Sequence, residues 1–251
     1  MGIEADGIAA EPEAPPARRR EVIYRHAFLV RFTHWINALA IFIMVGSGLA
    51  IFNAHPHLYW GQKGSELDHP FLSITGARAW PAWITIPSFQ DLANARHWHF
   101  LFAWILAANG LLYLAWGLFS GHLKRDIAPT LADLGTIPRS VIDHIKLKHP
   151  TGEAAKRYNV LQRLAYLGLI ILVVLMVATG LTMSPGFDAF APWLLDLFGG
   201  RQSARSIHFL CAAAIVAFVA VHLIEVVLAG PINEVRSMIT GRYAVPPDHG
   251  P

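Results

Sequence analysis

The sequence contains very little cysteine, since Cys211 is the single one among 251 residues. A lone thiol excludes a disulfide framework and a cysteine-based metal site, and the Cys-x-x-Cys-His motif that attaches a c-type haem covalently is absent. Charged residues are also scarce, at 15% of the chain, where a soluble domain carries about 25%. The basic residues form no stripe interleaved with aromatic side chains, which argues against nucleic-acid binding. These scarcities favour an integral membrane protein.

The first 22 residues lack an apolar segment. They are mostly Ala, Pro, Glu and Gly and end near the basic cluster Arg18–Arg20. A segment of this composition buries too little apolar surface to fold, so we expect residues 1–22 to be a disordered tail. Without an apolar core in this stretch, we expect no cleaved secretory signal.

Long apolar runs dominate the remaining chain, and 54% of all residues belong to the hydrophobic class. A helix needs about 20 apolar residues to cross a bilayer. Four runs meet that length, at 32–52, 97–119, 161–183 and 206–229. We therefore predict an all-α membrane protein, a bundle of four transmembrane helices over residues 23–240, with a C-terminal tail over 241–251.

Lysine and arginine indicate how this bundle is oriented. Fourteen lie in the N-terminal tail, the 120–160 segment and the C-terminal segment, against five in the other two connections. Because positive charge accumulates in cytoplasmic segments, we predict that both termini lie in the cytoplasm of a bacterial cell and that the 53–96 segment lies outside the inner membrane.

The fourth run carries two histidines, His208 and His222. Their fourteen-residue separation corresponds to about 21 Å along a helix axis, and steps of about 100° leave both rings on one face. Under the predicted orientation, His34 lies at the depth of His222 and His99 at the depth of His208. Placing a polar side chain at such a depth in the membrane costs free energy, so these histidines are candidates for a functional role. Two imidazoles at equal depth on neighbouring helices are typical of a bis-histidine b-type haem, whereas any single one could be a hydrogen-bonded packing residue.

Arginine precedes three of these histidines by three positions, as Arg31, Arg96 and Arg205. A three-residue offset places both side chains on one helix face. Each guanidinium could then pair with a haem propionate, although snorkelling at a helix end explains any single arginine equally well.

His97 competes with His99 as the ligand from the second helix. Residues two positions apart point about 200° away from each other, so only one of them faces the bundle interior. We choose His99 because Arg96 stands at the repeated spacing. His55 and His57 are expected in a loop. No role is assigned to the histidines outside the spans: His26, His69, His122, His144, His149 and His249.

Taken together, Arg31-x-x-His34-Trp35, Arg96-x-x-His99 and the His208/His222 pair resemble the bacterial dihaem cytochrome b561 family over residues 24–240. This family includes the cytochrome b subunits of nickel-iron hydrogenase, formate dehydrogenase and thiosulfate reductase. The resemblance implies two b-type haems and electron transfer between a catalytic partner and quinone.

The stretch Tyr158-Asn159-x-x-Gln162-Arg163 resembles Tyr-Asn-x-x-Gln-Lys of the formate dehydrogenase subunit, which lies beside a quinone pocket. The resemblance implies that Asn159 and Gln162 bind a quinone carbonyl. A helix N-cap is an equally good interpretation of Asn159.

The expected function is therefore electron transfer across the membrane between quinone and a periplasmic oxidoreductase of hydrogenase, formate dehydrogenase or molybdopterin-enzyme type. The long 53–96 segment is the expected docking surface, although its tryptophans, Trp60, Trp80 and Trp83, also suit a membrane interface. Two alternatives stay open. One is a stand-alone quinone-reducing oxidase of a small oxidant such as superoxide, and the other is a cofactor-free membrane anchor or transporter.

Overall fold

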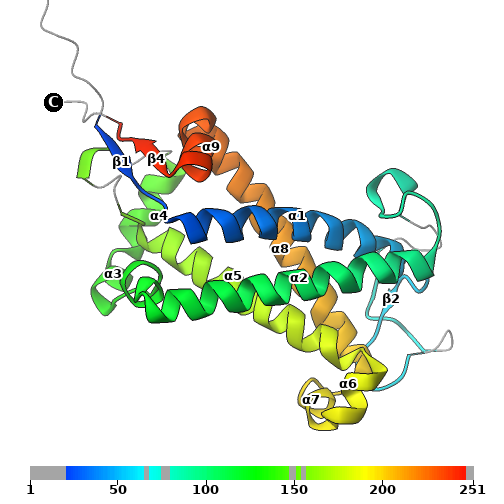
Figure 1. The fold of residues 1–251 in the computed structure, drawn as a ribbon. Coiled ribbons are helices and arrows are strands. Elements are labelled where there is room, and N and C mark those ends of the chain that lie inside the picture. The colour runs from blue at the N-terminus through cyan, green and yellow to red at the C-terminus, as the bar shows by residue number, and fades with distance from the viewer. Residues whose placement is uncertain (1–20, 65–67, 75–79, 147–150, 154–156, 247–251) are drawn as a thin grey trace, which may run out of the picture.

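The computed structural model describes residues 21–64, 68–74, 80–146, 151–153 and 157–246. Most of this chain is helical (Figure 1). Four helices are long and apolar enough to cross a membrane: α1 (Phe28–Phe52), α2 (Leu92–Phe119), α5 (Val160–Thr182) and α8 (Arg201–Ala229). The four predicted spans are thus confirmed, and the chain is a multi-pass membrane protein. Of the tail predicted to be disordered over residues 1–22, residues 1–20 lie outside the described residues, whereas Val22 belongs to a short strand.

Each long helix begins between one and five residues before its predicted start. The added first turns of α1, α2 and α8 contain Arg31, Arg96 and Arg205, which an apolar-run criterion leaves out. At the start of α2, the Asp91 carboxylate accepts a hydrogen bond from the Asn94 backbone N–H at 3.0 Å, as an N-cap residue does.

The long helices pack as two pairs, α1 with α2 and α5 with α8. Among the described residues, the backbones approach closely within each pair and much less between the pairs. Within the first pair, buried Asn109 of α2 donates hydrogen bonds to the Thr33 carbonyl at 2.8 Å and to Asn37 Oδ1 at 2.7 Å on α1. Within the second pair, Met176 packs against Cys211 and Ile215. Each pair is therefore a unit with its own contacts.

Short elements cover the two ends of the bundle (Figure 1). At one end, β1 (Val22–Tyr24) pairs antiparallel with β4 (Arg242–Ala244), beside α3 (Leu131–Gly135), α4 (Ile137–Ile145) and α9 (Pro231–Thr240). A π-helical turn, η2 (Leu123–Ile127), follows α2. We call this the β1/β4 end. The membrane domain was expected over residues 23–240 and the C-terminal tail over 241–251. Strand β4 lies in this expected tail but pairs with β1.

The opposite end, called the β2/β3 end, carries the connection between α1 and α2. Its elements are β2 (His57–Leu58), which pairs with β3 (Leu72–Ser73), the 3-10 turn η1 (Ala82–Ile84), α6 (Pro185–Phe190) and α7 (Pro192–Leu197).

This connection is fastened to the start of α8. The Gly61 N–H donates to the Ser203 hydroxyl at 2.7 Å, and the Ser206 hydroxyl donates to the Tyr59 carbonyl at 2.7 Å. Gly200 has a positive φ of 107°, and a Cβ there would lie 2.7 Å from the Gly61 oxygen. Glycine is therefore required at position 200 for conformation and for space.

Candidate haem centres

The structure brings the four predicted histidines together as two facing pairs. The ring centres of His34 on α1 and His222 on α8 are 6.3 Å apart, and those of His99 on α2 and His208 on α8 are 6.2 Å apart. An imidazole nitrogen lies about 2.0 Å from a metal ion that it binds, so two rings on opposite sides of one ion have centres about 6 Å apart. Both separations fit one iron between the rings.

Each facing pair bridges the two helix pairs. One histidine comes from the α1/α2 pair and the other from α8, and the backbones of these two helix pairs approach less closely than those within each pair. A wider spacing between helices is what a porphyrin inserted in a bundle requires, and such cofactors are held by side chains on facing helices. The residues present therefore fit two b-type haems, one at each histidine pair.

The rings of His99 and His208 are held by hydroxyl groups that were not predicted as site residues. Ser47 Oγ lies 3.1 Å from His99 Nδ1, and Thr179 Oγ1 lies 3.1 Å from His208 Nδ1. Metal-binding histidines commonly place the second ring nitrogen against such a partner, which fixes the orientation of the ring. The sequence feature that these two hydroxyl groups share is a similar tripeptide, Ser-Gly-Leu at 47–49 and Thr-Gly-Leu at 179–181.

At the other pair, the ring of His34 is enclosed differently. Trp35 meets it edge-on with ring centres 5.2 Å apart, and Phe218 lies parallel to the ring of His222 at 6.1 Å. His34 Nδ1 is buried and has no hydrogen-bond partner among the described residues. A buried polar atom without a partner is costly, and the Nδ1 of His34 therefore differs from those of His99 and His208, which lie against a hydroxyl.

Only one of His97 and His99 faces the bundle interior, as their two-residue spacing predicts. The side chain of His97 is exposed, whereas His99 is half-buried and faces His208. His99 and not His97 therefore faces His208, and ligation by His99 stays a prediction.

A family comparison supports the haem interpretation of this geometry. The model of the prokaryotic cytochrome b561 family matches residues 25–241, which is most of the chain. The chain belongs to the prokaryotic cytochrome b561 family. It is a membrane electron-transfer subunit of the b-type haem class, which removes the cofactor-free anchor and the transporter from the alternatives.

Two relatives of this cytochrome b561 carry provisional names. A protein from Azospira oryzae, named as the protein-methionine-sulfoxide reductase subunit YedZ1, is 34% identical over 214 residues, covering 83% of this chain and 93% of the relative. A protein from Bradyrhizobium diazoefficiens, named as a Ni/Fe-hydrogenase B-type cytochrome subunit, is 23% identical, covering 96% of this chain and 93% of the relative. Both names describe subunits of larger redox enzymes.

The three predicted arginines of the cytochrome b561 lie at the ends of the bundle. Arg31 donates hydrogen bonds to the Ile239 carbonyl and to the Tyr24 hydroxyl. Arg96 is exposed, and its guanidinium lies 5.6 Å from the centre of the Phe100 ring. Pairing of these groups with haem propionates stays a prediction.

Arg205 holds the α1–α2 connection. Its guanidinium donates to the carbonyls of His55 and His57. These two residues also line a pocket of about 330 Å³ together with Ala54, Pro56, Tyr59, Asp68 and Pro70. Arg205 stands one helical turn before His208 on α8, so the α1–α2 connection is fastened at the end of α8 that carries His208.

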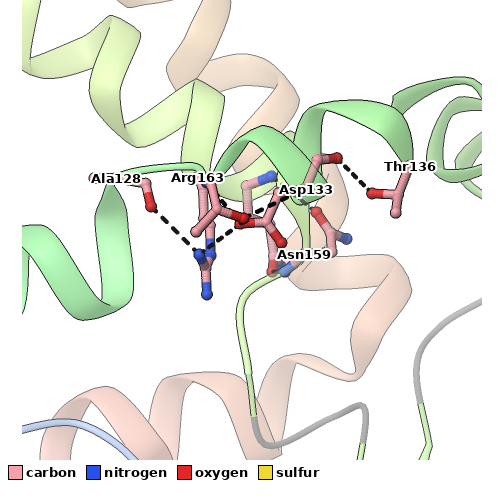
Figure 2. Close-up of polar contacts among 7 residues, drawn as sticks. Ala128, Asp133, Thr136, Asn159 and Arg163 are labelled. Carbon is pink, nitrogen blue, oxygen red and sulfur yellow. Dashed lines mark hydrogen bonds and ion pairs between the residues drawn. The ribbon is translucent and has the colours of Figure 1, made fainter.

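The two predicted quinone ligands of the cytochrome b561 form the N-terminal cap of α5. Asn159 Oδ1 accepts from the Gln162 backbone N–H at 2.8 Å, and Gln162 Oε1 accepts from the Asn159 backbone N–H at 3.1 Å. Figure 2 shows the neighbouring Arg163, which donates to the Ala128 carbonyl at 3.3 Å and to the Asp133 carboxylate at 3.0 Å. The capping interpretation of Asn159 is therefore confirmed. The amide NH2 groups of both residues take no part in this reciprocal capping box.

The same end contains two buried histidines to which the sequence assigned no role. His26 and His122 are each 8% exposed. His26 Nδ1 lies 3.3 Å from the Tyr158 hydroxyl, and His122 Nδ1 lies 2.8 Å from the Asp126 carboxylate. These histidines were assigned no role because they lie outside the apolar runs. Their burial comes from the short elements that cover this end of the bundle.

Replacing His26 with Gln should reduce the amount of folding stability that is lost as the pH falls into the mildly acidic range. Burial, followed by the positive charges of Arg25 and other neighbours, lowers the pKa of His26 to about 4 from 6.5. Between those values the unfolded chain binds a proton that the folded chain does not, so stability falls as the pH drops through that window, by roughly 3 kcal/mol at most. Melting temperatures in detergent between pH 7 and 4 measure this, with exposed His97→Gln as the control. Equal slopes in wild type and His26→Gln would contradict the assignment.

Proposed function

We propose that this cytochrome b561 binds two b-type haems and carries electrons across the bacterial inner membrane, between quinone and an oxidoreductase partner on the periplasmic side. The observation that supports this is the pair of histidine couples, each with ring centres 6.2–6.3 Å apart. Haem supplies one-electron redox chemistry when bound, and the protein supplies ligation, orientation and a low-polarity surrounding.

The chain's own residues account for a route across the bilayer. His208 and His222 lie fourteen residues apart on α8, which is about 21 Å along the helix axis. With both termini in the cytoplasm, as the distribution of lysine and arginine favours, the β1/β4 end is cytoplasmic and the β2/β3 end periplasmic. His34 and His222 then hold the cytoplasmic haem, and His99 and His208 the periplasmic one.

The proposed partner docks on the β2/β3 end. Trp60 and Phe71 stack there with ring centres 4.8 Å apart, and both are exposed. Trp83 is 83% exposed. Aromatic side chains are enriched at protein-binding surfaces, and the connection that carries Trp60 and Phe71 is hydrogen-bonded to the first turns of α8, which precede His208.

The names of the two relatives support two candidate partners. We propose an oxidoreductase of the protein-methionine-sulfoxide reductase kind, because the relative with that name is 34% identical. Electrons would then pass from quinol through this subunit to the partner. The second candidate is a hydrogenase, because the hydrogenase cytochrome covers 96% of the chain at 23% identity. Electron flow would then be reversed.

Membranes from cells with and without this protein distinguish these partners. The proposal predicts that deletion abolishes quinol-dependent reduction of methionine sulfoxide and leaves hydrogen-dependent quinone reduction unchanged. Loss of only the hydrogen-dependent reaction would replace the first partner with the second. Retention of both reactions would contradict both partner assignments.

The quinone is proposed to bind near the cytoplasmic haem through the amide NH2 groups of Asn159 and Gln162. Asn159→Asp and Gln162→Glu keep the capping oxygens but remove these donors. Loss of one hydrogen bond of about 1.4 kcal/mol corresponds to an about tenfold weaker affinity for quinol. We therefore expect an about tenfold higher KM for a quinol analogue in each variant, with the melting temperature retained. An unchanged KM in both variants would leave these residues with the capping role alone.

A further inference from the structure

Two buried hydroxyl groups occupy equivalent places in the two helix pairs. Ser47 on α1 lies against His99 on α2, and Thr179 on α5 lies against His208 on α8, each with 3.1 Å between the oxygen and Nδ1. Ser47 and Thr179 are both 0% exposed. A Cβ on the glycine that follows each of them would stand 3.4 Å from Cε1 of the same ring. Each ring is thus packed along one edge by a hydroxyl and a glycine.

The direction of these hydrogen bonds follows from the other partner of each hydroxyl. Ser47 Oγ donates to the Ile43 carbonyl at 2.8 Å, and Thr179 Oγ1 donates to the Leu175 carbonyl at 2.6 Å. A hydroxyl has one proton, so its oxygen presents a lone pair to the histidine. Nδ1 must then carry the proton and donate, which leaves Nε2 as the nitrogen with a free lone pair.

We propose that Ser47 and Thr179 are positioning residues that fix His99 and His208 as Nδ1–H tautomers, direct Nε2 to the iron and lower the reduction potential of the periplasmic haem. This inference rests on the proposed two-haem function. A hydrogen bond from Nδ1–H to an acceptor makes the imidazole a stronger donor to the metal. A stronger axial donor stabilises ferric over ferrous iron and is one of the levers by which a protein sets a haem potential.

The cytoplasmic pair provides an internal reference. Within the described part of the chain, His34 Nδ1 is buried without a hydrogen-bond partner. The proposed hydroxyl effect is therefore specific to one of the two sites, and substitutions of Ser47 and Thr179 should leave the other haem unaffected.

Potentiometric titration of the purified two-haem protein tests this inference. Ser47→Ala and Thr179→Ala should each raise the ferrous-to-ferric ratio of one haem about threefold at a fixed ambient potential, because each variant removes the acceptor beside one of the two histidines proposed to hold that haem. The double variant should raise it about tenfold, which is about 59 mV for one electron. Ser47→Thr and Thr179→Ser keep a hydroxyl and should keep the wild-type potential.

Thr182→Ala is the matched control. Thr182 lies on the same helix, is 1% exposed, and its hydroxyl donates to the Thr179 carbonyl at 2.7 Å and to no histidine. It should move neither potential. Two bound haems with unchanged potentials in the double variant would overturn the inference and leave the two-haem function intact. A wild-type protein with fewer than two haems would overturn the proposed function itself. Equal shifts of both haems would also count against a role specific to the His99–His208 site.

Discussion

A His222→Ala variant is expected to bind one haem per chain, where the wild type is expected to bind two. His222 faces His34 with 6.3 Å between ring centres, and alanine removes one of the two imidazoles that would hold the haem of that site. The His99–His208 pair lies fourteen residues away along α8 and keeps both of its rings. Haem content by pyridine haemochrome, divided by protein concentration, should fall by half. Quinol-dependent reduction of the remaining haem should fall by more than tenfold.

The control for this variant is His144→Ala at the same end of the bundle. His144 Nε2 lies 3.4 Å from the Glu225 carboxylate, and its side chain is 48% exposed. Its removal should leave haem content and quinol reactivity at the wild-type level. Two haems in purified His222→Ala would show that the cytoplasmic site has been assigned to the wrong residues.

His99→Ala should remove the other haem, whereas His97→Ala should remove neither. The two histidines stand two positions apart on α2, but only His99 faces His208, with ring centres 6.2 Å apart. His97 is exposed. We expect one haem per chain in His99→Ala, with reduction by quinol retained at the cytoplasmic haem and electron transfer to the periplasmic partner lost. Optical spectra of the reduced variants, recorded with haem quantification, measure both effects.

The comparison also separates ligation from simple destabilisation. If His99→Ala unfolded the bundle, both haems would be lost. Ser47→Ala, which touches the same ring and should retain both haems, shows whether the packing around His99 tolerates a small change. Loss of a haem from His97→Ala together with its retention in His99→Ala would reverse the assignment.

The membrane-spanning helices follow directly from the sequence because their apolar runs have one interpretation at this length. The starts of α1, α2 and α8 were placed too late, since their first turns contain Arg31, Arg96 and Arg205. The pairing of the histidines could also be predicted from the sequence. Helix periodicity puts His208 and His222 on one face, and the charge distribution supplies relative depth.

The contacts around the rings could not be obtained in the same way. Which helices pair determines that Ser47 meets His99 and that Thr179 meets His208, and no local pattern specifies helix pairing. The repeated Ser-Gly-Leu and Thr-Gly-Leu segments were visible, but their meaning depends on that tertiary arrangement.

The irregular segments were the least accessible. Arg205 has carbonyl partners at His55 and His57 because the α1–α2 connection folds back onto α8. His26 and His122 are buried because short elements cover the β1/β4 end. No periodic pattern in the sequence predicts either arrangement.

The number of haems bound by the purified wild-type protein is the most direct test of this account. Two facing histidine pairs predict two b-type haems per polypeptide, both low-spin in the ferric state because two imidazoles would bind each iron. Haem quantification against amino-acid analysis, with an electron paramagnetic resonance spectrum of the oxidised protein, measures this. A ratio of two with two low-spin signals is the predicted result. A ratio of one, or a high-spin signal from either haem, would contradict it.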